Sequence, residues 1–183
     1  MLKYYKIFQC ESEMDKLKIY HGSTFVVEEP NLEILNNRTD FGRGFYTTTD
    51  KMQAIKWAKI KKNRLKKESL DNIQGYVNIY EYTEIPELNI LKFEDATEEW
   101  LNFIYKNRQS NDLIHKYDIV IGPVADDNLY QVLLNYEAGV YEIEETIKRL
   151  KTYLLSNQIS FHTEKSLKSI KYIETIKVGE ENE

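Results

Sequence analysis

The chain has 183 residues, of which 42% are hydrophobic and 13% aromatic, and this composition excludes a protein that is disordered over most of its length. Its single cysteine, Cys10, excludes an intramolecular disulfide framework and a cysteine-based zinc site. No apolar run approaches the roughly 18 residues of a membrane span, and the N-terminus lacks the apolar region of a signal peptide, so we expect a globular, cytoplasmic protein without membrane association.

The net charge is −5, but the charge is unevenly distributed along the chain. Residues 51–67 contain eight basic residues and no acidic residue. This segment is either the solvated face of a helix or a local anion-binding surface for a nucleotide or nucleic acid. The acidity of the remaining chain argues against a general nucleic-acid binder.

The apolar periodicity, turn residues and capping residues predict the following elements in chain order. We expect strands over 17–21 and 44–48, a helix over 51–67, strands over 74–82 and 88–93, a helix over 97–108, a strand over 118–124, helices over 129–136 and 143–155, a strand over 158–163, one or two helical turns over 164–170, and a strand over 172–178. Thr49 or Asp50 can cap the basic helix. On this helix a mostly apolar stripe is formed by Met52, Ile55, Ala58 and Lys59.

Short strands mixed with helices, without regular alternation of strand and helix, predict an α+β fold of two packed layers. We expect a single domain over residues 17–178, an N-terminal extension over 1–16 and an acidic tail over 179–183. The glycine-rich dinucleotide and phosphate motifs and the nucleophile elbow of hydrolases are absent. His21, His115 and His162 lack the spacing of metal ligands, so we predict no metal site.

Three segments stand out together: residues 20–23 (YHGS), residues 40–57 (DFGRGFYTTTDKMQAIKW) and residues 157–163 (NQISFHT). In this order and at these separations they resemble the ADP-ribosyltransferase superfamily, in the branch with a His-Tyr-Glu triad that includes diphtheria toxin and the poly(ADP-ribose) polymerases. The chain also resembles a bacterial family of uncharacterised proteins within that superfamily. The resemblance covers about residues 20–178, and it implies a split mixed β-sheet with flanking helices and NAD⁺ as the substrate.

The resemblance assigns a role to several residues of this chain. His21 would bind the adenine-side ribose, Gly22 would hold the nicotinamide carboxamide through its backbone, and Ser23 would lie near the adenosine. Arg43 and Gly44 would also bind NAD⁺. They belong to the stretch GRGFY, which looks like the family's Gly-Lys-Gly-aliphatic-Tyr stretch. Tyr46 and Trp57, eleven positions apart, would sandwich the nicotinamide ring.

Two positions depart from the family pattern. Ala54 stands where the family has a serine that holds the carboxamide, and Gln158 stands where it has the catalytic glutamate. A one-step shift aligns Gln158 and Ser160 with the Gln-x-Glu of arginine-directed transferases, and neither alignment supplies an acid. Strand alternation places Gln158, Ser160 and His162 on one face, which we expect to line the site, and Ile159 and Phe161 on the other.

The resemblance therefore predicts catalysis by His21, Tyr46 and Gln158, with slow transfer of a single ADP-ribose to a protein or nucleic acid and release of nicotinamide. It further implies a toxin of a toxin–antitoxin or defence system, with an antitoxin protein as partner. Two alternatives remain open: a module that binds NAD⁺ or ADP-ribose without chemistry, and an interaction protein whose aromatic residues only form its core.

Overall fold

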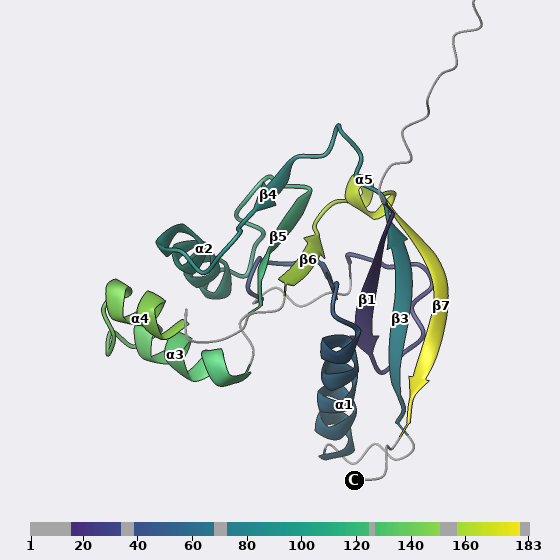
Figure 1. The fold of residues 1–183 in the computed structure, drawn as a ribbon, viewed down its shortest axis with the longest axis horizontal. Helices are drawn as coiled ribbons and strands as arrows, with labels where there is room; N and C mark the ends of the chain where they lie inside the picture. Colours follow the sequence, from purple (N-terminus) through teal and green to yellow (C-terminus); the bar gives the residue numbers. More distant parts are fainter. Residues whose placement is uncertain (1–15, 34–38, 68–72, 125–126, 151–156, 180–183) are drawn as a thin grey trace, which may run out of the picture.

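A computed structural model of the chain describes residues 16–33, 39–67, 73–124, 127–150 and 157–179. Within these residues the fold is α+β, as predicted, with a seven-stranded mixed sheet and five helices (Figure 1). Residues 1–15 of the N-terminal extension and residues 180–183 of the acidic tail lie outside the described residues.

All of the expected elements are present, with small shifts at their ends. The strands are β1 (Leu17–Ser23), β2 (Phe45–Thr48), β3 (Gly75–Tyr82), β4 (Ile90–Lys92), β5 (Ile119–Pro123), β6 (Asn157–Phe161) and β7 (Ile170–Val178). The helices are α1 (Lys51–Lys67), α2 (Glu98–Gln109), α3 (Asp127–Glu137), α4 (Ile143–Leu150) and α5 (Glu164–Leu167). The last five residues of the helix expected over 143–155 lie outside the described part of the chain.

Side-chain caps fix where three helices begin. The Asp50 carboxylate accepts a hydrogen bond from the Met52 backbone N–H at 2.8 Å and so caps α1, one of the two residues expected to do so. The Thr97 hydroxyl caps α2 by accepting from the Trp100 backbone N–H. Thr163 and Ser166 form a reciprocal capping box at α5.

The strands are ordered β4-β5-β6-β2-β1-β3-β7, and only β4 and β5 pair in parallel. β1 pairs with β3 along its whole length, but it pairs with β2 at a single position, Tyr20 opposite Thr48. The sheet therefore consists of two parts that meet at a narrow contact between β1 and β2.

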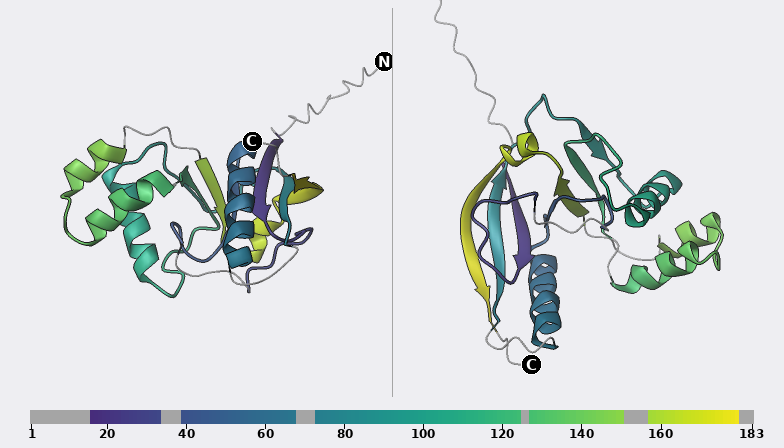
Figure 2. Two further views of the ribbon diagram at one scale, coloured as in Figure 1. Left: turned by 90° about the horizontal axis from the view of Figure 1, so that it is seen from below. Right: turned by 180° about the vertical axis from the view of Figure 1, so that it is seen from behind.

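Three hydrophobic clusters cover the sheet. One contains Phe45, Ile159 and Phe161 and lies on one face of both parts. On the opposite face, α2, α3 and α4 pack around Trp100 and Leu133 beside β5, and α1 packs on β1 and β3 around Ala54 and Ala58. Figure 2 shows α2, α3 and α4 gathered at one end of the molecule and α1 nearer its middle, against β1 and β3.

The apolar stripe expected on α1 is wrong at its start, because Met52 is 65% exposed. The helix instead buries Gln53, Ala54, Ala58 and Lys62. The reason is Gly22 in β1: a Cβ atom there would overlap the Ala54 carbonyl oxygen and lie 2.9 Å from the Ala58 backbone nitrogen. Small residues on both elements let helix and strand touch backbone to backbone.

Candidate functional site

The three residues predicted to be catalytic lie on three neighbouring strands. His21 is on β1, Tyr46 on β2 and Gln158 on β6, in the sheet order β6-β2-β1. β1 and β2 stop pairing beside them, and side chains bond two backbone carbonyls there. His21 Nδ1 lies 2.6 Å from the Tyr46 carbonyl oxygen, and Lys61 Nζ donates to the Gly22 carbonyl oxygen at 2.8 Å.

The His21 imidazole is neutral in this environment. Burial, together with the positive charge of Lys61, lowers the pKa of His21 to about 3. Because a carbonyl can only accept, the proton sits on Nδ1, and Nε2 carries a lone pair that has no hydrogen-bond partner among the described residues. His21 thus offers an acceptor for a hydroxyl group. Its ring packs on Phe45, with ring centroids 4.6 Å apart.

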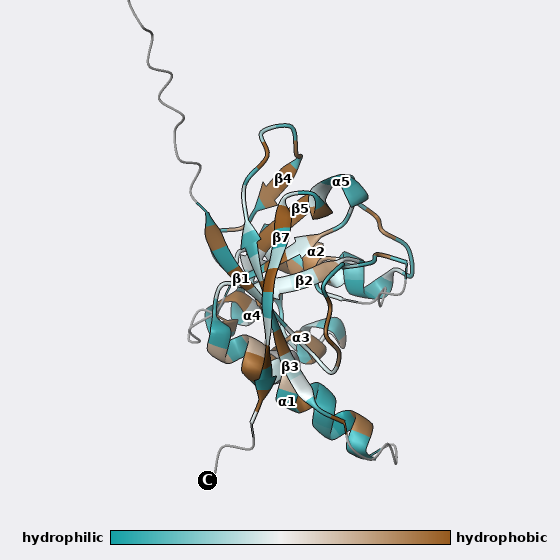
Figure 3. Cartoon of the chain, turned by 90° about the vertical axis from the view of Figure 1, so that its right-hand side faces the viewer, coloured by the Kyte–Doolittle hydropathy of each residue, from teal (hydrophilic) through white to brown (hydrophobic). Residues whose placement is uncertain are grey.

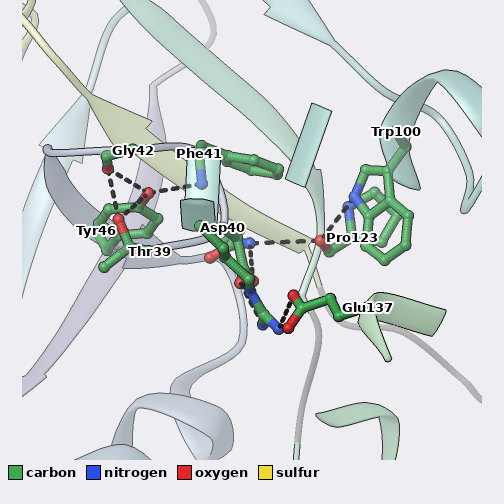
Figure 4. Close-up of polar contacts among 10 residues, drawn as sticks. Thr39, Asp40, Phe41, Gly42, Tyr46, Trp100, Pro123 and Glu137 are labelled. Carbon is green, nitrogen blue, oxygen red and sulfur yellow. Dashed lines mark hydrogen bonds and ion pairs between the residues drawn. The ribbon is translucent and has the colours of Figure 1, made fainter. Parts of the chain in front are cut away.

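The Tyr46 hydroxyl is committed to the loop that precedes β2. It lies 2.8 Å from Thr39 Oγ1, accepts from the Phe41 backbone N–H at 2.9 Å and donates to the Gly42 carbonyl at 2.7 Å (Figure 4). Burial raises the pKa of this phenol well above its ordinary value. Gly42 has a φ of 81°, a left-handed conformation that favours glycine, so the tight loop depends on this residue.

The structure does not bring Tyr46 and Trp57 together as a ring pair. The described rings beside Tyr46 are Phe41 and His162, at centroid distances of 6.5 and 6.4 Å. Trp57 lies half-buried on α1. A nicotinamide clamp made by Tyr46 and Trp57 therefore stays a prediction.

Gln158 is 7% exposed, and its amide belongs to a polar cluster. Gln158 Nε2 donates to Asp40 Oδ2 at 3.1 Å and to the Pro123 carbonyl at 3.4 Å. Asp40 in turn forms an ion pair of 2.6 Å with Arg108, which lies 3.9 Å from Glu137. Figure 4 shows Asp40, Pro123 and Glu137 converging on this cluster from the loop, β5 and α3.

The alternation expected along β6 is confirmed, but its polar face is not an open edge. Ser160 is fully buried, and its hydroxyl lies 2.8 Å from His162 Nε2. His162 Nδ1 lies 2.7 Å from the Arg43 carbonyl, and burial lowers the pKa of His162 to about 4. The rings of His115 and His162, far apart in the sequence, meet edge to face at 4.6 Å. Ser160 and His162 are thus hydrogen-bonded inside the protein, and so is the NH₂ group of Gln158.

Arg43, Ser23 and Gly44, to which the resemblance also assigns roles, make contacts within the protein. The Arg43 guanidinium donates twice to the Leu32 carbonyl, at 2.8 and 2.6 Å. Ser23 Oγ accepts from the Phe25 backbone N–H at 3.2 Å. Gly44 lets β2 approach β6, since a Cβ atom there would lie 2.7 Å from His162 Nδ1.

Sequence reasoning missed Asp40, Arg108 and Lys61 as members of this site. Asp40 opens the segment that carries the resemblance, but no spacing connects it with Arg108 near the end of α2 or with β6. Lys61 was recognised only as one charge of the basic segment. Much of α1 is hydrophilic (Figure 3), and Arg64, Lys66 and Lys67 are exposed on its last turn.

The described residues contain no group of three or more His, Cys, Asp or Glu side chains that could hold a metal ion. Among the described helices, none has the length and apolar character needed to cross a membrane.

One protein-family model matches residues 17–172, and its description is a protein of unknown function, DUF3990. No curated protein matches the chain, and no solved structure does so.

Proposed function

We propose that this chain, which belongs to the DUF3990 family of unknown function, is an NAD⁺-dependent mono-ADP-ribosyltransferase with an ADP-ribosyltransferase-like fold. It transfers ADP-ribose to a macromolecular acceptor, a protein or a nucleic acid, and releases nicotinamide. The resemblance in sequence also leads us to propose a toxin of a toxin–antitoxin or defence system, neutralised by an antitoxin protein.

The observation that best supports this proposal is the adjacency of β1, β2 and β6. His21, Tyr46 and Gln158 are distant in the sequence, yet their strands are neighbours in the sheet. The sheet also stops pairing between β1 and β2, so the Gly22 and Tyr46 carbonyls there are bonded by side chains. Side chains can move aside for a ligand more easily than a paired strand can.

In the proposed reaction the bond between ribose C1′ and the pyridinium nitrogen breaks. Nicotinamide leaves as a neutral molecule with the bonding electron pair, and an acceptor nucleophile forms the new bond to C1′ and loses its proton to solvent. Positive charge develops on the ribose between these events. His21 Nε2 accepts a hydrogen bond from the adenine-side ribose. Gln158 Oε1 accepts one from the nicotinamide-side ribose, where its dipole stabilises the charge less than a carboxylate would.

A second candidate function is a module that binds NAD⁺ or ADP-ribose without chemistry. The neutral amide at position 158 favours it, because loss of one such electrostatic contribution costs about 10²–10³ in rate. Binding of NAD⁺ without release of nicotinamide would identify this module.

The test combines calorimetric NAD⁺ binding with chromatographic detection of nicotinamide, followed by incubation with labelled NAD⁺ and a cell lysate. We expect binding, slow release and labelling of protein or nucleic acid. His21→Ala should weaken NAD⁺ binding. His115→Ala is the matched control, because it also removes an imidazole that lies 2.8 Å from a backbone carbonyl, that of Phe41. Equal NAD⁺ affinity of the wild type and a folded His21→Ala variant would contradict the site.

A further inference from the structure

The carboxylate of Asp40 lies directly behind the Gln158 amide. Asp40 Oδ2 accepts from Gln158 Nε2 at 3.1 Å, and Asp40 Oδ1 accepts two hydrogen bonds from Arg108, at 3.0 and 2.6 Å. The side chains of Asp40 and Arg108 are only 14% and 16% exposed. Since Arg108 also approaches Glu137, the described residues place two carboxylates against this guanidinium.

Two acceptors determine which end of the Gln158 amide faces this cluster. The Asp40 carboxylate and the Pro123 carbonyl can accept but not donate, so both must face the NH₂ group. The carbonyl oxygen Oε1 then points away from the cluster. Within the described part of the chain Oε1 accepts no hydrogen bond, so this oxygen is left to accept one from a ligand.

We propose that Asp40 is a positioning residue of this site and supplies its negative charge through Gln158. This inference rests on the proposed function and deepens it. Asp40 holds the amide so that a ribose hydroxyl meets the acceptor Oε1 and not the NH₂ group. The hydrogen bond to a carboxylate also polarises the amide and increases the negative charge on Oε1. Arg108 holds Asp40 in place, and the charge missing at position 158 is present one hydrogen bond away.

This arrangement predicts the effect of replacing Gln158 by glutamate. The new carboxylate would face Asp40 and the Pro123 carbonyl, neither of which donates, with Arg108 already bonded to Asp40 and Glu137 beyond it. Repulsion between neighbouring carboxylates raises the pKa of the pair, so one of the two retains a proton. Adding Asp40→Asn places an amide donor opposite the carboxylate introduced at position 158 and restores the original number of charges.

The experiment is a double-mutant cycle on the full chain with Asp40→Asn, Gln158→Glu and their combination, measured by urea unfolding at pH 8 and pH 5.5. At pH 8 the unfolding equilibrium constant of the double variant should be roughly tenfold smaller than independent effects of the two substitutions would give. At pH 5.5 this coupling should be weaker. Asp118→Asn is the matched control: this buried carboxylate bonds Thr163 and Asn89, so it should show no coupling to Gln158→Glu. Additive effects at pH 8 would overturn the assignment. If the Gln158→Glu variant does not fold, the cycle is made with Asp40→Ala and Gln158→Ala. Coupling between these two substitutions would support the assignment, and additive effects would overturn it.

Nicotinamide release tests the positioning role separately. Asp40→Asn should lower kcat by about 10- to 100-fold with a smaller change in KM, because the amide loses its fixed orientation. The double variant Asp40→Asn with Gln158→Glu should release more nicotinamide than either single variant. If the substitutions acted only by damaging the structure, the double variant would release less than either. An unchanged kcat in Asp40→Asn would overturn the positioning role. A wild type that releases no nicotinamide would overturn the proposed function and the catalytic role together, while the cycle would still decide the contact.

Discussion

Replacing Gly22 by alanine tests the contact that seats α1 on the sheet. The added Cβ would overlap the Ala54 carbonyl oxygen and lie 2.9 Å from the Ala58 backbone nitrogen. Both atoms belong to the helix backbone, where they are fixed by the helical hydrogen bonds, so the helix must move as a body. Overpacking of this kind costs about 1–3 kcal/mol, and a shift of α1 also strains the bond from Lys61 to the Gly22 carbonyl, worth a further 1.5–3 kcal/mol or so. We therefore expect Gly22→Ala to lower the free energy of unfolding by about 3 kcal/mol or more.

The assay is urea unfolding of Gly22→Ala beside two comparison variants. Gly75→Ala faces the same helix, but its Cβ would lie 3.4 Å from Ala58 Cβ, an ordinary contact, so its effect should stay within about 1 kcal/mol. Ala54→Gly should not rescue Gly22→Ala, because the clash is with the backbone oxygen and not with the Ala54 side chain. Stability of Gly22→Ala within about 1 kcal/mol of the wild type would refute the reasoning.

Three further predictions concern the loop, the histidines and the basic helix. Tyr46→Phe removes the hydroxyl that accepts from Phe41 N–H and should lower the free energy of unfolding by about 1–3 kcal/mol in urea; equal stability would contradict the role of the hydroxyl. The pKa of His162 is lowered from 6.5 to about 4, so between these pH values the unfolded chain binds more protons than the folded one. The contribution of His162 to the free energy of unfolding should therefore be fully present above pH 6.5 and decrease as the pH falls towards 4. His162→Gln should reduce the slope of the free energy of unfolding against pH by up to about 1.4 kcal/mol per pH unit. If urea unfolding gives the same slope for the variant and the wild type, this prediction is wrong. If the acceptor is a nucleic acid, changing Arg64, Lys66 and Lys67 to serine should reduce the slope of log binding constant against log salt concentration by about 2–3. The same changes at Lys168, Lys171 and Lys177 should leave the slope unchanged. Equal slopes for both sets would mean that the basic residues of α1 only form a solvated face.

The sequence alone determined which segments become helices and strands. Asp50, Thr97 and Thr163 supply caps that act within three residues, and the alternation along Asn157–Phe161 sorts its side chains between the two faces. These signals are local: a cap or a two-residue period depends on the neighbouring backbone and not on a distant partner. For the same reason the sequence predicted the residue ranges of β2 and α1 to within one residue.

Tertiary structure alone decided which residues share the site. Asp40 meets Gln158 across 118 positions of sequence because the loop before β2 and the start of β6 lie side by side, and Arg108 reaches Asp40 from α2. Tertiary packing also left Met52 exposed and buried Ala54, since the close approach of α1 to Gly22 sets the rotation of the helix. Such contacts depend on strand order, register and the orientation of packed helices, and these are fixed by the joint burial of many distant side chains, which no local pattern encodes.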